Sequence, residues 1–302
     1  MSATAALLTE GRLHLQHGPI DLVIGVDGAR APAYRAAQHC FAGLLQRLVD
    51  ELPQLRQPVG PALQGPVAQR MRAACLPFAP AHFVTPMAAV AGAVADQVLH
   101  ALRAQSAPIE RAYVNNGGDI ALYLAPGGHF DIAVAGLDGH GLGRIALQAA
   151  MGVGGIATSG RGGRSLSMGV ADSVTVLAKT AAAADVAATL IANAVDLPGH
   201  PAIARQPACV VQPDSDLCTR PVVVGLGPLA PAEAAQALAN GMALAHQFHA
   251  QGHILGAVLC LQGQTRIIGA PLDAPLDAAQ APMQRLPMKP PLSEGYAHHA
   301  TG

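Results

Sequence analysis

The sequence has 302 residues and a formal net charge of -1 at pH 7, enough chain for one large domain or two small ones. Hydrophobic residues account for 51% of the chain and aromatic residues for 3%, which predicts a core of Ala, Val, Leu and Ile. The near-neutral charge, with no Lys and Arg cluster among aromatic residues, argues against nucleic acid and anionic membranes as partners.

Cysteine usage and the N-terminus favour a cytoplasmic protein. The cysteines are odd in number, far apart and never in CxxC spacing, which predicts reduced thiols and neither a disulfide framework nor a thiolate zinc site. Glu10 and Arg12 interrupt any signal-peptide pattern, and the apolar run over 85–102 contains Asp96 and His100. We therefore expect no membrane span.

The first elements are a hairpin and two helices. Two strand-like runs within residues 12–25 meet at a Gly-Pro pair, which is typical of a hairpin. Apolar residues at three-to-four spacing then predict one helix over 32–53. A Pro, Gln and Gly-rich loop over 54–64 precedes a shorter helix over 67–74.

The middle of the chain predicts a helix and then strands. Thr85 and Pro86 are typical of an N-cap and a first helical position, which predicts a helix from Met87 to about Arg103. Three strand-like runs follow, over residues 111–114, 120–124 and 130–134.

The last part begins with a strand over 172–177 that leads into an alanine-rich helix ending near residue 195. Residues 197–220 are interpreted as a surface excursion. The remaining predicted elements are a strand over residues 222–224, a helix over 231–251 and a strand over 254–260.

Strand pairs followed by helices in both halves predict an α+β fold with antiparallel sheets packed against helices. We expect a single domain over residues 1–270, with a division into two related βα layers left open. Repeated prolines predict an extended C-terminal tail over residues 271–302.

The sequence NNGGD at residues 115–119 places two amides and a carboxylate around a Gly-Gly turn. Such a turn is ordinary hairpin chemistry. Its unusual member is Asp119, whose charge would lie beside a glycine backbone, at Gly118, that can approach a ligand closely. Asn116, Gly118 and Asp119 are therefore candidate site residues, with a plain hairpin as the alternative.

The glycine-rich segment over 152–163 offers backbone N–H groups, the hydroxyls of Thr158 and Ser159, and the guanidinium of Arg161. A loop of this composition can cradle an anion such as phosphate, although it can equally be a mobile connection. Arg164 extends the same polar surface towards Asp172.

Asp185 and Thr189 lie four residues apart in the alanine-rich helix and therefore share one face. A carboxylate and a hydroxyl are the hard oxygen ligands that magnesium accepts, although they fill only part of its octahedron. The alternative interpretation is an Asp on the solvated face of a helix.

Taken together and in chain order, these motifs resemble those of the ApbE superfamily of FAD:protein FMN transferases. The matching segments are GAVAD at 92–96 (KGxxxD in the family), NGGDI at 116–120 (NxGGDI), GIATSG at 155–160, and VTVLAKTAAAADVAATL at 174–190 (VTVxAxxAxxADAxAT). An uncharacterised branch of the superfamily is more similar still, through GPIDL at 18–22, TPMAAVAGAVAD at 85–96, YVNNGGDIAL at 113–122 and PDSDL at 213–217.

The resemblance implies an ApbE-like, T-fold-like architecture. It implies that Asp185 and Thr189 hold Mg²⁺, which bridges the FAD pyrophosphate for FMN transfer or hydrolysis, and that Thr158 and Ser159 line the pocket. The chain departs from the family at Ala91, where the family has lysine, and over 161–172, which replaces a segment with an HxxDP motif.

We expect a protein that binds an anionic or phosphorylated small molecule, with Mg²⁺ and with FAD or FMN as the flavin ligand the family implies. Arg161 or Arg164 would meet the anion. One alternative is a non-catalytic binding or assembly protein that has lost flavin chemistry. Another is a metal-independent hydrolase or isomerase that uses Asp119 or Asp172 as general base. A homo-oligomer is compatible with each.

Overall fold

The protein is described by a computed structural model over residues 3–135, 141–163 and 165–269. Its centre is one nine-stranded sheet in which every neighbouring pair of strands is antiparallel. In spatial order the strands are β1 (Thr4–Leu7), β2 (Leu13–His17), β3 (Ile20–Gly28), β4 (Ile109–Asn116), β5 (Asp119–Leu124), β8 (Gly155–Ser159), β9 (Ser173–Ala178), β12 (Gly256–Leu261) and β13 (Gln264–Ile268).

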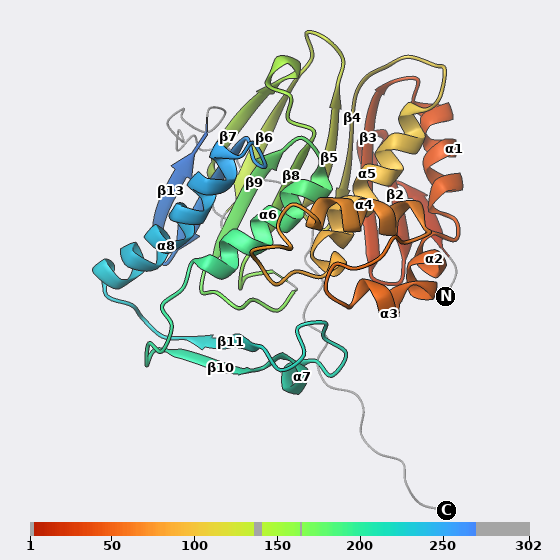
Figure 1. Cartoon of the computed structure of the whole chain (residues 1–302). Coiled ribbons are helices and arrows are strands. Elements are labelled where there is room, and N and C mark those ends of the chain that lie inside the picture. Colours follow the sequence, from red (N-terminus) through yellow and green to blue (C-terminus); the bar gives the residue numbers. More distant parts are fainter. Residues whose placement is uncertain (1–2, 136–140, 164, 270–302) are drawn as a thin grey trace, which may run out of the picture.

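A layer of helices covers one face of this sheet (Figure 1). Helices α5 and α6 pack at its centre because their apolar faces are built almost entirely from Ala, Val and Leu. No helix in the described part of the chain is long and apolar enough to cross a membrane. The helices are α1 (Arg30–Phe41), α2 (Leu44–Asp50), α3 (Leu52–Leu55), α4 (Pro66–Cys75), α5 (Val90–Arg103), α6 (Ala181–Ala194) and α8 (Pro231–Ala250).

The opposite face is partly covered by a separate hairpin of β6 (His129–Ala135) and β7 (Gly141–Gln148) (Figure 1). A second apolar cluster lies between this hairpin and the sheet, and its buried members are Leu122, Leu147, Ile156, Leu177 and Val258. The mixed, antiparallel and helix-backed architecture confirms the α+β prediction.

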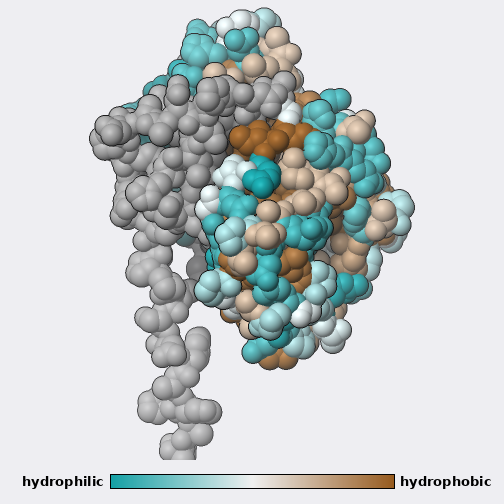
Figure 2. All heavy atoms as spheres, turned by 90° about the vertical axis from the view of Figure 1, so that its left-hand side faces the viewer, coloured by the Kyte–Doolittle hydropathy of each residue, from teal (hydrophilic) through white to brown (hydrophobic). Residues whose placement is uncertain are grey.

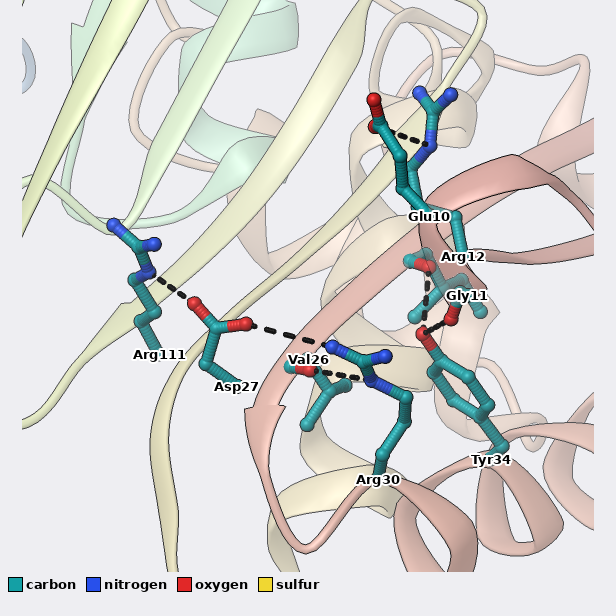
Figure 3. Close-up of polar contacts among 9 residues, drawn as sticks. Glu10, Gly11, Arg12, Val26, Asp27, Arg30, Tyr34 and Arg111 are labelled. Carbon is teal, nitrogen blue, oxygen red and sulfur yellow. Dashed lines mark hydrogen bonds and ion pairs between the residues drawn. The ribbon is translucent and has the colours of Figure 1, made fainter.

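Ion pairs and hydrogen bonds connect the N-terminal hairpin to β4 and α1 at the end of β3 (Figure 3). Asp27 lies between two guanidinium groups, with Arg111 Nε at 2.5 Å and Arg30 Nη2 at 3.7 Å from its carboxylate oxygens. The Tyr34 hydroxyl donates to the carbonyl oxygens of Gly11, at 2.8 Å, and Ile24, at 3.2 Å. These contacts join β3, β4 and α1.

A small arm projects from the body, made of β10 (Ile203–Pro207), the short helix α7 (Ala208–Val211) and β11 (Pro221–Leu226) (Figure 1). The amide of Val223 donates to the Ser167 carbonyl at 2.8 Å, and the Arg220 guanidinium lies 3.2 Å from the centre of the Phe83 ring. The predicted surface excursion over 197–220 is therefore a strand and a helical turn.

The surface is mixed where α8 faces the solvent. Figure 2 shows the left-hand side of Figure 1, on which hydrophilic residues are interspersed with small separate groups of hydrophobic ones. Among the described residues of α8, the buried side includes Ala237, Leu238 and Phe248, and the helix ends where Gly252 adopts a φ of +73°.

Two sequence predictions are wrong in this part of the molecule. The single helix predicted over 32–53 is broken into three helices. Gly43 adopts a left-handed φ of +74° between α1 and α2, and Glu51 leaves the helical conformation between α2 and α3. Thr85 precedes a 3₁₀ turn (Pro86–Ala89), and its hydroxyl makes no capping bond there. The predicted tail over 271–302 lies outside the described residues.

Candidate functional site

The NNGGD segment is a tight hairpin turn between β4 and β5. Gly117 and Gly118 have φ values of +65° and +115°, which an L side chain rarely adopts. The Asn115 Oδ1 accepts from the Gly118 amide at 2.9 Å. Asp119 follows as the first residue of β5, and its Oδ1 accepts from the Thr158 amide at 3.3 Å. The turn therefore places the Asp119 carboxylate against β8.

The GIATSG segment, predicted as an anion-binding loop, forms the strand β8, so that prediction of its local structure is wrong. The Thr158 hydroxyl pairs with the Thr175 hydroxyl of β9 at 2.9 Å. Gly155 allows α6 to begin directly on the strand, because a Cβ there would lie 2.1 Å from the Ala181 amide nitrogen. Thr158 and Ser159 thus lie on a sheet strand next to Asp119.

Helices α5 and α6 cap each other. Asp96 of α5 accepts from the amides of Ala181, at 3.1 Å, and Ala182, at 2.9 Å, in the first turn of α6. In return, Asp185 Oδ2 of α6 accepts from the Gly92 amide at 3.0 Å, in the first turn of α5. Each carboxylate satisfies amides that have no partner within their own helix.

Removing Asp96 should therefore destabilise the helix pair. We expect Asp96→Ala to lower the free energy of unfolding by about 2 kcal/mol, because two buried helical amides lose their acceptor. Chemical denaturation followed by circular dichroism measures this change. Asp50→Ala is the control, since Asp50 is exposed and accepts only from the Gln46 side chain. Equal stability of the two variants would contradict the capping role.

Asp185 lies close to other carboxylates. Burial raises the pKa of Asp185 well above its ordinary value, and the negative charges of Asp119 and, to a smaller extent, Asp96 raise it further. The amides of Gly92 and Ala91 oppose this rise by hydrogen bonding to the carboxylate. The structure therefore brings together Asp119 and Asp185, which are 66 residues apart in the sequence (185 − 119).

Asn116 and Thr189 belong to the same region. The Asn116 side chain is 5% exposed and donates from Nδ2 to the Ala91 carbonyl at 3.1 Å, so it holds the start of α5 in place. Thr189 lies one helical turn after Asp185 on the same face of α6 and is partly buried. Ala91 stands where the resembled family has lysine. It lies in the first turn of α5, whose amides hydrogen-bond to Asp185.

Asp172 and Arg161 pair with each other. Asp172 Oδ1 accepts from Arg161 Nε at 2.9 Å and Nη2 at 2.5 Å, and its Oδ2 accepts from the Gln262 amide at 2.6 Å. Asp172 precedes β9 and therefore lies at the end of that strand remote from the first turn of α6. Arg164 lies outside the described residues.

Thr85, Cys75 and Asp216 make contacts that were not predicted from the sequence. The Thr85 hydroxyl donates to Asp216 Oδ2, and the Thr85 carbonyl accepts from the Cys75 thiol at 3.4 Å. Asp216 belongs to the PDSDL segment, which the sequence analysis used only as a mark of resemblance. A carboxylate far from any predicted helix gives no local signal of such a contact.

Cys75 should be unreactive in the folded protein. Burial, together with the negative charge of Asp185, raises the pKa of its thiol to about 12. Roughly one Cys75 in ten thousand is then a thiolate at pH 8. We expect iodoacetamide at this pH to alkylate the exposed Cys218 and to spare Cys75, as read by peptide mass spectrometry. Alkylation in urea, where both react, is the control; rapid labelling of native Cys75 would contradict its burial.

In the part of the chain that the structure describes, no group of three or more His, Cys, Asp or Glu side chains is arranged to hold a metal ion. A cation at Asp119 and Asp185 would therefore have two carboxylates and the Thr189 hydroxyl as its protein donors. These are hard oxygen ligands, which fit magnesium, an ion that usually keeps several waters.

The chain is similar to several known proteins. A family model described as AbpE bacteria matches residues 5–267. A UPF0280 protein of Methanococcus vannielii is 42% identical over 119 residues, which cover 36% of this chain and 45% of the relative. One from Methanopyrus kandleri is 41% identical over 128 residues, covering 42% and 48%. The matched region thus spans about half the length of these curated relatives.

Two solved structures are also similar. The ApbE protein of Thermotoga maritima has 12% identity and a TM-score of 0.49, covering 89% of this chain and 96% of its own. The apo flavinyl transferase ApbE of Pseudomonas stutzeri has 13% identity and a TM-score of 0.46, covering 93% and 99%.

Proposed function

The chain belongs to the AbpE bacteria family, and on that premise we propose that Asp119, Asp185 and Thr189 hold Mg²⁺ and, through it, the phosphate groups of an anionic small molecule. The membership confirms the ApbE-like resemblance seen in the motifs.

One observation carries this proposal. Asp119 lies against β8 through the Thr158 amide, and Asp185 lies in α6, which begins directly beside the same strand. The negative charge of Asp119 raises the pKa of Asp185. Two carboxylates held in this way repel each other, and a divalent cation between them would remove the repulsion.

The surrounding residues have distinct tasks in this proposal. Asn116 fixes the first turn of α5 through the Ala91 carbonyl, and that turn positions Asp185 through the Gly92 amide. Thr158 orients Asp119 through its own amide. Ser159 and Gly118 would lie beside the ligand. Bound Mg²⁺ would neutralise charge on a phosphate or pyrophosphate group.

The narrower proposal is a flavin transferase or FAD pyrophosphatase. Incubation with FAD and Mg²⁺ should yield FMN and AMP, or AMP with flavin attached to protein. Calorimetric titration with Mg²⁺ provides a readout independent of turnover. Mg²⁺ binding without any flavin product would support the metal site and contradict the flavin activity. Absence of both Mg²⁺ binding and flavin product would contradict the whole proposal.

A second candidate, a non-catalytic ligand-binding protein, is favoured by two departures. Ala91 cannot supply the charge of the family lysine, and Arg161 is engaged by Asp172. In this case the protein would bind FAD or FMN, seen as quenching of flavin fluorescence, with no change in the flavin itself. The metal-independent base proposed at Asp172 would require its pair with Arg161 to open.

A further inference from the structure

A pocket lies between helices of the layer that covers the sheet. It is an open pocket of about 300 Å³ between α4, the first turn of α6 and the chain that follows α8. This volume is at the lower end of the range of small-molecule sites. Asp119, Asp185 and Thr189 are not among the residues that line it.

The pocket exists because small side chains face each other across it. Its lining includes Ala73 and Ala74 of α4 and Ala182 and Ala183 of α6. Phe78, which is 3% exposed, closes the apolar end. A ligand that fills this space would therefore present an apolar part to the alanines and the ring.

Arg70 supplies the pocket with an oriented positive charge. Its Nε donates to the Gln97 side chain at 2.9 Å, which anchors the guanidinium from one side. Within the described residues, the bond to Gln97 is the hydrogen bond that Arg70 makes, and its positive charge also acts on Asp96 in the pocket lining. A ligand oxyanion can therefore meet its two terminal amino groups. A guanidinium held through Nε can form bidentate hydrogen bonds from its two terminal amino groups to two oxygens of one carboxylate or phosphate group.

His253 and Thr180 add further polar groups. The His253 ring packs against the Phe78 ring, with 4.9 Å between centroids, and its nitrogens bond to no other described residue. The Thr180 hydroxyl accepts from the Ala183 amide and keeps its own proton for donation. Asp96 also lines the pocket, and both of its oxygens accept hydrogen bonds from α6 amides.

We propose that this pocket binds a small organic oxyanion, a carboxylate or phosphate ester with a planar apolar group, whose oxygens are held by Arg70. The apolar group lies on the alanines and Phe78. His253 and Thr180 complete the polar side. The inference is independent of the metal site.

The probe is phenyl phosphate, titrated by calorimetry in the presence of EDTA so that no metal contributes. We expect it to bind at least about tenfold more tightly than inorganic phosphate or phenol, because only the combined molecule uses both sides of the pocket. The His253 ring protons should shift in the NMR spectrum on binding, which locates the ligand.

Two variants and a matched control test the assignment. Arg70→Gln should weaken binding at least about tenfold. Ala73→Leu should block the pocket, and because Ala73 is exposed the variant should fold normally. Arg72→Gln is the control, since Arg72 lies on the same helix and donates to the Gly60 carbonyl instead.

Loss in both pocket variants, with binding kept in Arg72→Gln, supports the proposal. Any of three results overturns it: no binding of phenyl phosphate at about 10 mM, wild-type binding by both pocket variants, or an equal loss in the control.

Discussion

Replacing Gly92 by alanine is expected to lower the free energy of unfolding by about 3 kcal/mol or more. Gly92 lies where α5 crosses the start of α6. A Cβ at this position would lie 2.3 Å from the Ala181 carbonyl oxygen and 2.7 Å from the Ala182 nitrogen. These are backbone atoms, so no side chain can turn away to make room. The helices would have to separate, and both reciprocal caps would lengthen.

Thermal and urea unfolding of the variant measure the effect. Gly60→Ala is the matched control, because a Cβ there meets only the Pro58 carbonyl, at an ordinary distance of 3.6 Å. In a helix an alanine is intrinsically preferred to glycine by up to about 1 kcal/mol. A Gly92→Ala variant as stable as wild type would therefore show that the helices do not approach as closely as described.

Replacing Asp185 by asparagine should separate stability from binding. Mg²⁺ affinity should fall at least about tenfold, because the site loses one of its two carboxylates. In the absence of metal, the same variant should be as stable as wild type or more stable, by about 1 kcal/mol. The neutral amide removes the repulsion with Asp119, while its oxygen can still accept from the Gly92 amide.

Calorimetric titration with Mg²⁺ and urea unfolding in EDTA measure the two effects separately. Asp50→Asn, at an exposed position, controls for a general loss of charge. If Asp185→Asn unfolds more easily and binds Mg²⁺ normally, the carboxylate serves only as a helix cap and the metal proposal is wrong.

The secondary-structure elements that could be predicted from the sequence are those determined by residues adjacent in the chain. The strand and helix over 172–195 were predictable because a β-branched run changes to an alanine run at one point. The Gly-Gly turn at 117–118 was predictable because few residues other than glycine adopt its backbone angles. The strand β8 was missed because five residues flanked by glycines have the composition of a loop, and its identity as a strand depends on β5 and β9.

The site was predictable only in part. Spacing along one helix linked Asp185 to Thr189, but nothing local linked either to Asp119 or to the first turn of α5. The bond between Asp96 and Ala181 spans 85 positions, and that between Thr85 and Asp216 spans 131. Such contacts arise from the packing of the whole domain. Arg161 and Asp172, only 11 positions apart, were each predicted as site residues, and the ion pair between them was not predicted.

The exchange of caps between α5 and α6 has a consequence for how the protein responds to a ligand. A cation that drew the Asp185 carboxylate towards itself would weaken the hydrogen bond from the Gly92 amide. Occupancy of the site and order in the first turn of α5 are then thermodynamically linked. Asn116 bonds to the Ala91 carbonyl of that turn, and Thr85 precedes the 3₁₀ turn that leads into it. Loosening the turn would therefore affect the β4–β5 hairpin and the contact of Thr85 with Asp216.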